Sequence, residues 1–366
     1  MSKRMKQAFR VLRLFIFIIL FAELNLRVFA SILLSPRHLT HGIPAFVDFK
    51  AGIYKFGGNW GIQPVPRPIP GQTYRVPLSS GEIALARINN AGFRGADFSI
   101  QKSKGVIRIA TMGASSTFGF GNRDDETYPH QLQEMLNIAC PTITKFEVYN
   151  FGIPFMTSAG IASIYNEIAS GYNPDLVTFY EGVNDTGEGP ETTFSRYWDW
   201  MRSYSLIVEI LNVPVIGYLQ SYSQSDIDQG ISQMTQEFIA NVESIAKNST
   251  LNSGAKFIVA TQQAKSYIVP VESIKGVTYE NEYQIVRQKA ETDRVGLWAL
   301  RFARHHELMH ALRSWAMDSG FELVELQAAL DLDRDYLTSW VHLNKDGNAI
   351  IARILADKIT EKYCND

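Results

Sequence analysis

Short apolar runs alternate with amphipathic stretches along most of this chain. Helical spacing of apolar residues predicts α-helices, and runs of β-branched and aromatic residues predict buried strands. The predicted strands are 106–110, 146–150, 176–180, 257–260 and 321–326. The predicted helices lie around 132–136 and over 159–170, 231–246, 297–317 and 349–362. Because strands and helices alternate, the pattern predicts an α/β domain with a parallel sheet covered on both faces.

Three stretches depart from this alternation. Residues 35–77 are predicted to be irregular, because a proline at every second position from 64 to 70 makes a stiff connector. Residues 265–296 are polar and indicate no clear element. Residues 187–228 are rich in aromatic side chains. They predict an insertion that forms a lid or a sugar-stacking wall, or that simply packs onto the domain.

The N-terminal segment predicts a membrane anchor. Basic residues between positions 3 and 13 precede an apolar stretch that continues to Leu34. Residues 11–34 are long enough to cross a bilayer, and the basic flank places the rest of the chain on the extracytoplasmic side. Glu23 and Arg27 interrupt the stretch, but they lie four residues apart on one helix face and can pair. A cleaved signal peptide ending near Ala30 and a helix of a cytoplasmic protein are the alternatives.

Composition narrows the class of protein. A chain of 366 residues that is 46% hydrophobic and 20% charged fits a globular protein with a substantial core. Its net charge of -2 gives no indication of a nucleic-acid partner. The predicted organisation is an anchor or signal peptide at 1–34, a connector and lead-in segment at 35–104, and one α/β domain at 105–366 that carries the insertion.

Cysteine and histidine usage predicts neither a metal site nor a cofactor. Two cysteines, Cys140 and Cys364, are too few for a disulfide framework or a metal site, and we expect free thiols, with pairing as the alternative. The predicted helix 297–317 carries three histidines, at positions 305, 306 and 310. Without ligand spacing to cysteines or carboxylates, these predict a solvated helix face rather than a metal site.

Four residues with catalytic chemistry follow the predicted strands or precede the last helix. Ser115 follows the first strand after a turn at Gly113, Gly152 follows the second, Asn184 follows the third, and His342 precedes the final helix. The carboxyl ends of parallel strands meet at one edge of a sheet, so these residues are expected to converge. A turn whose serines only cap a helix is the alternative.

Acyl transfer requires a nucleophile, a base and donors aimed at the developing oxyanion. Ser115 is the predicted nucleophile and His342 its general base. The backbone N–H groups of Ser115 and Gly152 and the side chain of Asn184 are the predicted oxyanion donors. Gly182 is expected to let the chain pass close to the substrate without a side chain.

These motifs resemble the SGNH (GDSL-type) hydrolase family. Gly-Ala-Ser-Ser-Thr-Phe-Gly at 113–119 resembles the nucleophile block, and 150–152, 182–185 and 341–344 resemble the later blocks. The similarity covers about residues 88–362, and the N-terminal helix and the segment 90–94 resemble a membrane-anchored branch. The resemblance implies a three-layer α/β/α fold with a flavodoxin-like parallel sheet, and ester chemistry without a metal. The short block also differs from the Gly-x-Ser-x-Gly elbow of α/β-hydrolases.

Two positions depart from the family pattern. Ala114 replaces the usual Asp of the nucleophile block, and Ser339 stands where the family places its triad acid, three residues before the histidine. A hydroxyl can orient the imidazole but cannot stabilise an imidazolium by charge, and loss of that carboxylate costs about 10⁴-fold in a serine protease. Either a nearby carboxylate substitutes, from Asp335, Asp333 or Asp331, or the site works as a Ser–His dyad.

The sequence therefore predicts a membrane-anchored, extracytoplasmic serine esterase. It is expected to remove a short acyl group, such as acetyl, from a carbohydrate or a lipid. One alternative is an O-acyltransferase in which a sugar hydroxyl accepts an acyl group delivered by a membrane-protein partner. The other is a catalytically impaired binding subunit of an envelope complex, which the missing triad acid suggests.

Overall fold

The computed structural model describes residues 13–14, 17–25, 67–78, 80–141, 143, 145–187, 221–270, 273–331 and 333–364. The chain divides into two units. Met1–Ala51 and Glu191–Gln220 form one, and Gly52–Pro190 and Ser221–Asp366 form the other. Most of the predicted insertion, Arg27 and the prolines at 64 and 66 lie outside the described residues. Among the described helices, none combines the length and the apolar character that a membrane crossing needs.

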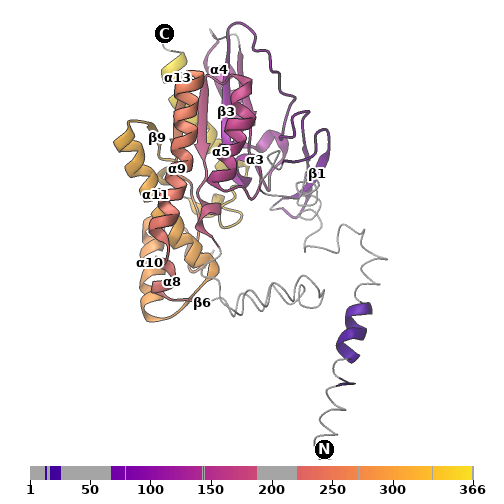
Figure 1. The fold of residues 1–366 in the computed structure, drawn as a ribbon, viewed down its shortest axis with the longest axis vertical. Coiled ribbons are helices and arrows are strands. Elements are labelled where there is room, and N and C mark those ends of the chain that lie inside the picture. Colours follow the sequence, from indigo (N-terminus) through magenta and orange to yellow (C-terminus); the bar gives the residue numbers. More distant parts are fainter. Residues whose placement is uncertain are drawn as a thin grey trace, which may run out of the picture. The chain divides into compact units, whose positions relative to one another are not determined.

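A five-stranded parallel sheet forms the centre of the second unit (Figure 1). Its spatial order is β4-β3-β5-β7-β9. Counted by appearance along the chain this is 2-1-3-4-5, the order of flavodoxin-like sheets, and the predicted fold class is confirmed. The strands are β3 (Val106–Gly113), β4 (Lys145–Asn150), β5 (Leu176–Tyr180), β7 (Lys256–Ala260) and β9 (Glu322–Val324).

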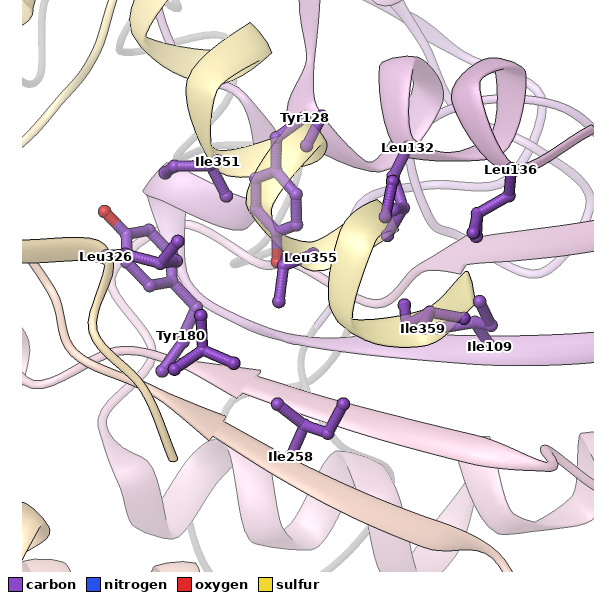
Figure 2. Close-up of a cluster of buried hydrophobic side chains, with 14 of the residues drawn as sticks. Ile109, Tyr128, Leu132, Leu136, Tyr180, Ile258, Leu326, Ile351, Leu355 and Ile359 are labelled. Carbon is purple, nitrogen blue, oxygen red and sulfur yellow. The ribbon is translucent and has the colours of Figure 1, made fainter. Parts of the chain in front are cut away.

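Helices cover both faces of this sheet. Figure 2 shows Leu132 and Leu355 from two helices packed against strand residues Ile109 and Ile258. The helices on this face are α4 (Tyr128–Ala139), α12 (Leu326–Leu330) and α13 (Lys345–Tyr363).

The opposite face is identified by strand alternation, because successive residues of a strand point to opposite sides. Tyr180 belongs to the cluster of Figure 2, whereas its neighbour Phe179 packs on Phe238, with 6.1 Å between ring centroids. This second layer consists of α5 (Ser158–Glu167), α9 (Ile231–Lys247) and α11 (Leu297–Ser319).

The structure contains elements that the sequence pattern did not predict. An antiparallel hairpin, β1 (Thr73–Pro77) and β2 (Ile83–Arg87), lies in and just after the stretch predicted to be irregular. The polar stretch 265–296 contains α10 (Tyr279–Thr292) and β8 (Val295–Gly296), and β8 pairs with β6 (Ser221–Tyr222). Together with α8 (Gln224–Asp228), these elements bury a separate apolar cluster against the first half of α11.

The two cysteines form a disulfide, so the expectation of free thiols is wrong. Cys140 directly follows α4 and Cys364 directly follows α13, and their Cα atoms are 5.5 Å apart. The two helices pack side by side on one face of the sheet, which brings their ends together. A separation of 224 residues along the chain hides this proximity in the sequence.

Candidate active site

The nucleophile turn joins β3 to a single helical turn, α3 (Ser115–Phe118). Gly113 ends the strand, and a Cβ there would collide with the side chain of Thr117 and the carbonyl oxygen of Tyr180. Close packing, rather than the turn freedom predicted from the sequence, therefore requires glycine at this position. Ser115 opens α3 and is half-buried.

The loop before α13 brings His342 to this serine. The Nε2 atom of His342 lies 2.8 Å from the Oγ atom of Ser115. The loop closes on itself, because the backbone N–H of Thr338 donates to the carbonyl oxygen of His342 at 2.8 Å. The side chain of Asn122 donates to the carbonyl oxygen of Leu343 at 2.9 Å, which ties the loop to the segment after α3.

Ser339 occupies the other nitrogen of the His342 ring. Its Oγ atom lies 2.9 Å from Nδ1, and it also accepts the backbone N–H groups of His342 at 3.0 Å and Val341 at 3.3 Å. A hydroxyl has two lone pairs and one hydrogen. Because both lone pairs are engaged by backbone N–H groups, we infer that the hydroxyl donates its hydrogen to Nδ1. This arrangement favours the imidazole tautomer that carries its proton on Nε2.

The three aspartates considered as substitutes for the triad acid lie elsewhere. Asp335 is exposed, and Asp333 accepts the backbone N–H of Asp335 at 3.2 Å. Asp331 accepts the side chain of Gln263 at 2.9 Å and the backbone N–H of Tyr279 at 2.8 Å. In the described part of the chain no carboxylate contacts the His342 ring. Desolvation lowers the pKa of His342 to about 4.

The predicted oxyanion donors lie at the same edge of the sheet. Gly152 follows β4, and a Cβ on it would collide with the backbone of Thr117 and Phe118 in α3. Its N–H donates to the side-chain oxygen of Asn150 at 2.9 Å. Asn184 donates one side-chain hydrogen to the carbonyl oxygen of Met156 at 3.0 Å. The second hydrogen of that amide is the one available to a substrate.

Gly182 faces α11. A Cβ at this position would collide with the methyl group of Met309 and lie 3.4 Å from the ring of His305, so the methionine side chain would have to shift to admit a larger residue. The role predicted from the sequence, a close passage of the chain past the substrate, stays a prediction.

A polar residue that the sequence pattern did not identify connects the nucleophile turn to the turn after β5. Gln262 follows β7, and its Oε1 atom accepts the backbone N–H of Val183 at 3.0 Å. Its Nε2 atom lies 3.4 Å from the hydroxyl of Ser116. Gln262 thus joins the turn that carries Ser115 to the turn that carries Asn184. The sequence does contain an indication of this role for Gln262. A polar run directly follows a buried strand, at the edge of the sheet where sites form.

The predicted solvated histidine face is wrong for His305. This residue is fully buried, and its Nδ1 atom lies 2.6 Å from the hydroxyl of Tyr279. Burial lowers the pKa of His305 to about 3. His310 is exposed, as predicted. Over the residues that the structure describes, no group of three or more His, Cys, Asp or Glu side chains is arranged to hold a metal ion.

Two carboxyl groups, one buried and one half-buried, support the Asn184 turn. Glu181 accepts the backbone N–H of Asn184 at 3.1 Å, and burial raises the pKa of Glu181 to about 7. Asp185 accepts the backbone N–H of Ser158 at 2.9 Å, and burial raises the pKa of Asp185 to about 6. Beside them lies a cleft of about 400 Å³, whose polar lining residues include Asn184, Asp185, Gln233, Glu237, Asn241 and Arg304.

Arg94 fixes the backbone that follows α3. Its buried guanidinium donates to the carbonyl oxygens of Gly119 and Asn122, both at 2.7 Å, and pairs with Asp124 at 2.8 Å. The segment 90–94 therefore holds the nucleophile turn in place from outside the sheet.

The chain is similar to known hydrolases. The model of the GDSL-like lipase/acylhydrolase family matches residues 111–350. No curated protein sequence matches the chain. A putative lipolytic protein of the G-D-S-L family from Desulfitobacterium hafniense shares 13% identity, with a TM-score of 0.40 over 68% of this chain and 98% of that one. An acetylxylan esterase from Geobacillus stearothermophilus shares 16%, with a TM-score of 0.42 over 71% and 96%. A carbohydrate acetylesterase from Sinorhizobium meliloti shares 12%, with a TM-score of 0.41 over 70% and 100%.

Proposed function

Because this chain belongs to the GDSL-like lipase/acylhydrolase family, we propose that it is a serine esterase with Ser115 as nucleophile and His342 as general base. The observation that carries this proposal is the 2.8 Å separation between the Ser115 hydroxyl and Nε2 of His342. That distance is within hydrogen-bond reach, which is the geometric requirement for proton transfer between them.

In the first half of the proposed reaction, Ser115 Oγ attacks the ester carbonyl carbon while His342 Nε2 takes the hydroxyl proton. The negative charge that develops on the carbonyl oxygen is held by the side chain of Asn184 and the backbone N–H of Ser115. The N–H of Gly152 joins them only after it leaves the side-chain oxygen of Asn150. One such donor commonly contributes about 2.7–4 kcal/mol. The C–O bond then breaks, and His342 returns the proton to the leaving alcohol.

In the second half, a water molecule attacks the acyl-enzyme carbonyl while His342 takes its proton. Collapse of this tetrahedral intermediate breaks the bond to Ser115 Oγ, which recovers the proton, and a free acid leaves. Both halves need Nε2 without a proton at the start. The ring must therefore hold its proton on Nδ1, and the hydroxyl of Ser339 must turn away from it. This rearrangement slows the reaction relative to a site with a triad carboxylate.

The location and substrate class are part of the proposal. A disulfide between Cys140 and Cys364 is typical of proteins in oxidising compartments outside the cytoplasm. The helical residues 17–25 carry exposed apolar side chains such as Phe17 and Phe21, which supports attachment to a membrane. We therefore place the domain on the extracytoplasmic side, anchored through its N-terminal segment, where it removes a short acyl group from an acylated carbohydrate or lipid.

The polar cleft beside Asn184 also supports a second candidate, an O-acyltransferase. Amide and carboxylate side chains such as Gln233 and Glu237 line this cleft and suit a sugar hydroxyl that replaces water as acyl acceptor. A membrane-protein partner would then supply the acyl group. Ser339 in place of a triad acid motivates a third candidate, a binding subunit of an envelope complex with little catalytic activity.

Turnover of p-nitrophenyl acetate by the full chain tests the esterase. We expect turnover by the wild type, its loss in the Ser115→Ala variant, and a fluorophosphonate adduct on Ser115 detected by peptide mass spectrometry. Turnover that persists in Ser115→Ala would contradict the assignment. Neither turnover nor an adduct would favour the binding subunit, and acylated sugar among the products of a reaction with a polysaccharide acceptor would favour the transferase.

Fractionation tests the location. We expect the full chain in the membrane fraction, with the domain digested by a protease added outside intact cells or spheroplasts. Protection from that protease, with digestion only after lysis, would place the domain in the cytoplasm instead.

A further inference from the structure

Three aromatic side chains from distant parts of the chain contact one another. Tyr267 follows β7, Trp298 lies in the first turn of α11, and Trp340 is two residues before His342. The ring centroids of Trp298 and Trp340 are 4.7 Å apart, and those of Tyr267 and Trp298 are 6.2 Å apart. We call Tyr267, Trp298 and Trp340 the aromatic platform.

The aromatic platform is not part of the hydrophobic core. Trp298 is 41% exposed and Tyr267 is 45% exposed. Most of the large aromatic side chains in the described residues are buried, and aromatic surface left in water beside a reactive centre marks a binding surface.

The loop that presents Tyr267 is rigidly supported. The backbone N–H of Lys265 donates to the carbonyl oxygen of Trp340 at 2.8 Å, and the backbone N–H of Ser266 donates to Glu282 at 2.8 Å. Glu282 forms a fully buried ion pair with Arg334, at 2.6 Å. The loop therefore rests on a charged pair inside the protein and is tied directly to the segment that carries His342.

Tyr267 also adopts an unfavourable backbone conformation. Its φ of +62° lies in the left-handed region, which a bulky residue rarely occupies. Such a conformation persists only where the surroundings impose it, and it is concentrated at functional positions. The supported loop thus holds a strained tyrosine with its ring toward solvent.

Charged groups at the edge of the aromatic platform indicate which ligand fits it. The guanidinium of Arg301 lies 4.3 Å from the centroid of the Trp340 ring. The ammonium of Lys265 lies 5.5 Å from that of Tyr267, but it is buried and donates to the carbonyl oxygen of Leu337 at 2.7 Å. A lipid tail would desolvate the half-buried guanidinium of Arg301 without replacing its hydration. A sugar ring offers C–H groups to the electron-rich aromatic faces and keeps its hydroxyls in water, beside this cation.

We propose that the aromatic platform binds the sugar rings of an acylated polysaccharide and so presents its ester to Ser115. This inference rests on the proposed esterase function and narrows its substrate from a carbohydrate or lipid to a carbohydrate chain. Trp340 is two residues before His342 in the chain. Arg301, whose guanidinium lies over the Trp340 ring, donates to the carbonyl oxygen of Val183 at 3.1 Å, in the turn that carries Asn184. The platform is therefore tied to both segments that carry reacting groups.

Truncation of Trp298 tests the proposal by kinetics. The substrates are acetylated xylan, acetylated mannan, acetylated alginate and p-nitrophenyl acetate, which has no sugar ring. For Trp298→Ala we expect the ratio of kcat/KM on the preferred polysaccharide to kcat/KM on p-nitrophenyl acetate to fall at least about tenfold, mainly through KM. Tyr267→Ala is expected to act in the same direction, and Trp298→Phe to recover most of the ratio.

Trp315→Ala is the matched control. Trp315 lies on the same helix, stacked on Phe321, and a separation of 17 residues at 1.5 Å per residue places it roughly 25 Å from Trp298. We expect the ratio to be unchanged in this variant. An equal fall in Trp315→Ala and Trp298→Ala would show a general effect on the fold and overturn the proposal.

Binding measured without turnover separates this inference from the proposed reaction. In affinity electrophoresis with the same polysaccharides, the Ser115→Ala variant is expected to be retarded, and Ser115→Ala combined with Trp298→Ala is not. If the wild type hydrolyses p-nitrophenyl acetate but no polysaccharide retards Ser115→Ala, the aromatic platform is not a sugar site. If Trp298→Ala instead lowers activity on dispersed triacylglycerol, the surface binds lipid. Retardation without any ester hydrolysis would support sugar binding by the aromatic platform and contradict the proposed esterase function.

Discussion

His342 and His305 both have pKa values well below the ordinary value, yet only one of them can serve a reaction. His342 lies on a loop at the edge of the sheet, half-buried, with the hydroxyls of Ser115 and Ser339 at its two nitrogens. His305 lies on α11, fully buried, with Tyr279 at one nitrogen and Gln262 at the other. Both rings are neutral at pH 7, because burial lowers the pKa of each.

The difference shows that a shifted pKa does not by itself identify a catalytic histidine. Contact with a nucleophile and access for a substrate distinguish the two regions. His305 and its partners instead form a buried polar support behind the site, since Gln262 connects them to the turns of Ser115 and Asn184.

Among the variants that test this difference, replacement of His342 is expected to have the largest effect on activity. His342→Gln should lower kcat for p-nitrophenyl acetate by about 10⁴-fold or more, because no general base remains. Initial-rate kinetics measure this. His310→Gln, at an exposed position on α11, is the matched control and should retain wild-type activity. A fall of less than about tenfold in His342→Gln would show that another group removes the proton.

Introduction of a carboxylate beside His342 should have the next largest effect. Ser339→Asp is expected to raise kcat/KM by about 10²-fold. The carboxylate only accepts hydrogen bonds, so it places the ring proton on Nδ1 and stabilises the imidazolium. Ser339→Asn has a similar shape without the charge and should give no gain. An unchanged or lower kcat/KM in Ser339→Asp, with the variant correctly folded, would mean that the Ser339 hydroxyl does not limit the rate.

Removal of the buried histidine should affect stability more than chemistry. His305→Leu leaves the hydroxyl of Tyr279 buried without its partner, which commonly costs about 1–3 kcal/mol. Urea denaturation followed by circular dichroism measures the loss, and kcat of the folded variant should stay within about tenfold of wild type. A loss of activity as large as that of His342→Gln, at unchanged stability, would give His305 a direct part in the reaction.

The pH dependence of kcat/KM should show the smallest but most specific effect. His342 must be unprotonated to accept a proton, and its pKa is lowered to about 4. The rate should therefore fall only as the pH drops through about 4, with activity retained at pH 5.5. In Ser339→Asp the added negative charge raises the pKa of His342, so the fall should begin at a higher pH. A wild-type acid limb near pH 6.5 would contradict the desolvated environment.

Much of the fold and the main pair of the candidate site were predictable from the sequence. Hydrophobic patterning is local, and it located the five strands of the sheet and their order of appearance. Since parallel strands end at one edge, the positions of Ser115, Gly152 and Asn184 directly after strands predicted their convergence. The position of His342 just before the last helix predicted that it joins them.

Contacts between distant segments were decided only by the tertiary structure. The partner of the His342 Nδ1 atom, the packing of α11 on Gly182, and the disulfide at the ends of α4 and α13 each depend on which helices lie together. The aromatic platform likewise draws its residues from three segments that share no local pattern. Patterning indicates which apolar side chains are buried, because these follow the period of their own helix or strand. It does not identify a buried polar residue such as His305. Nor does it report what a buried side chain contacts, because the packing of the whole chain decides which residues become neighbours.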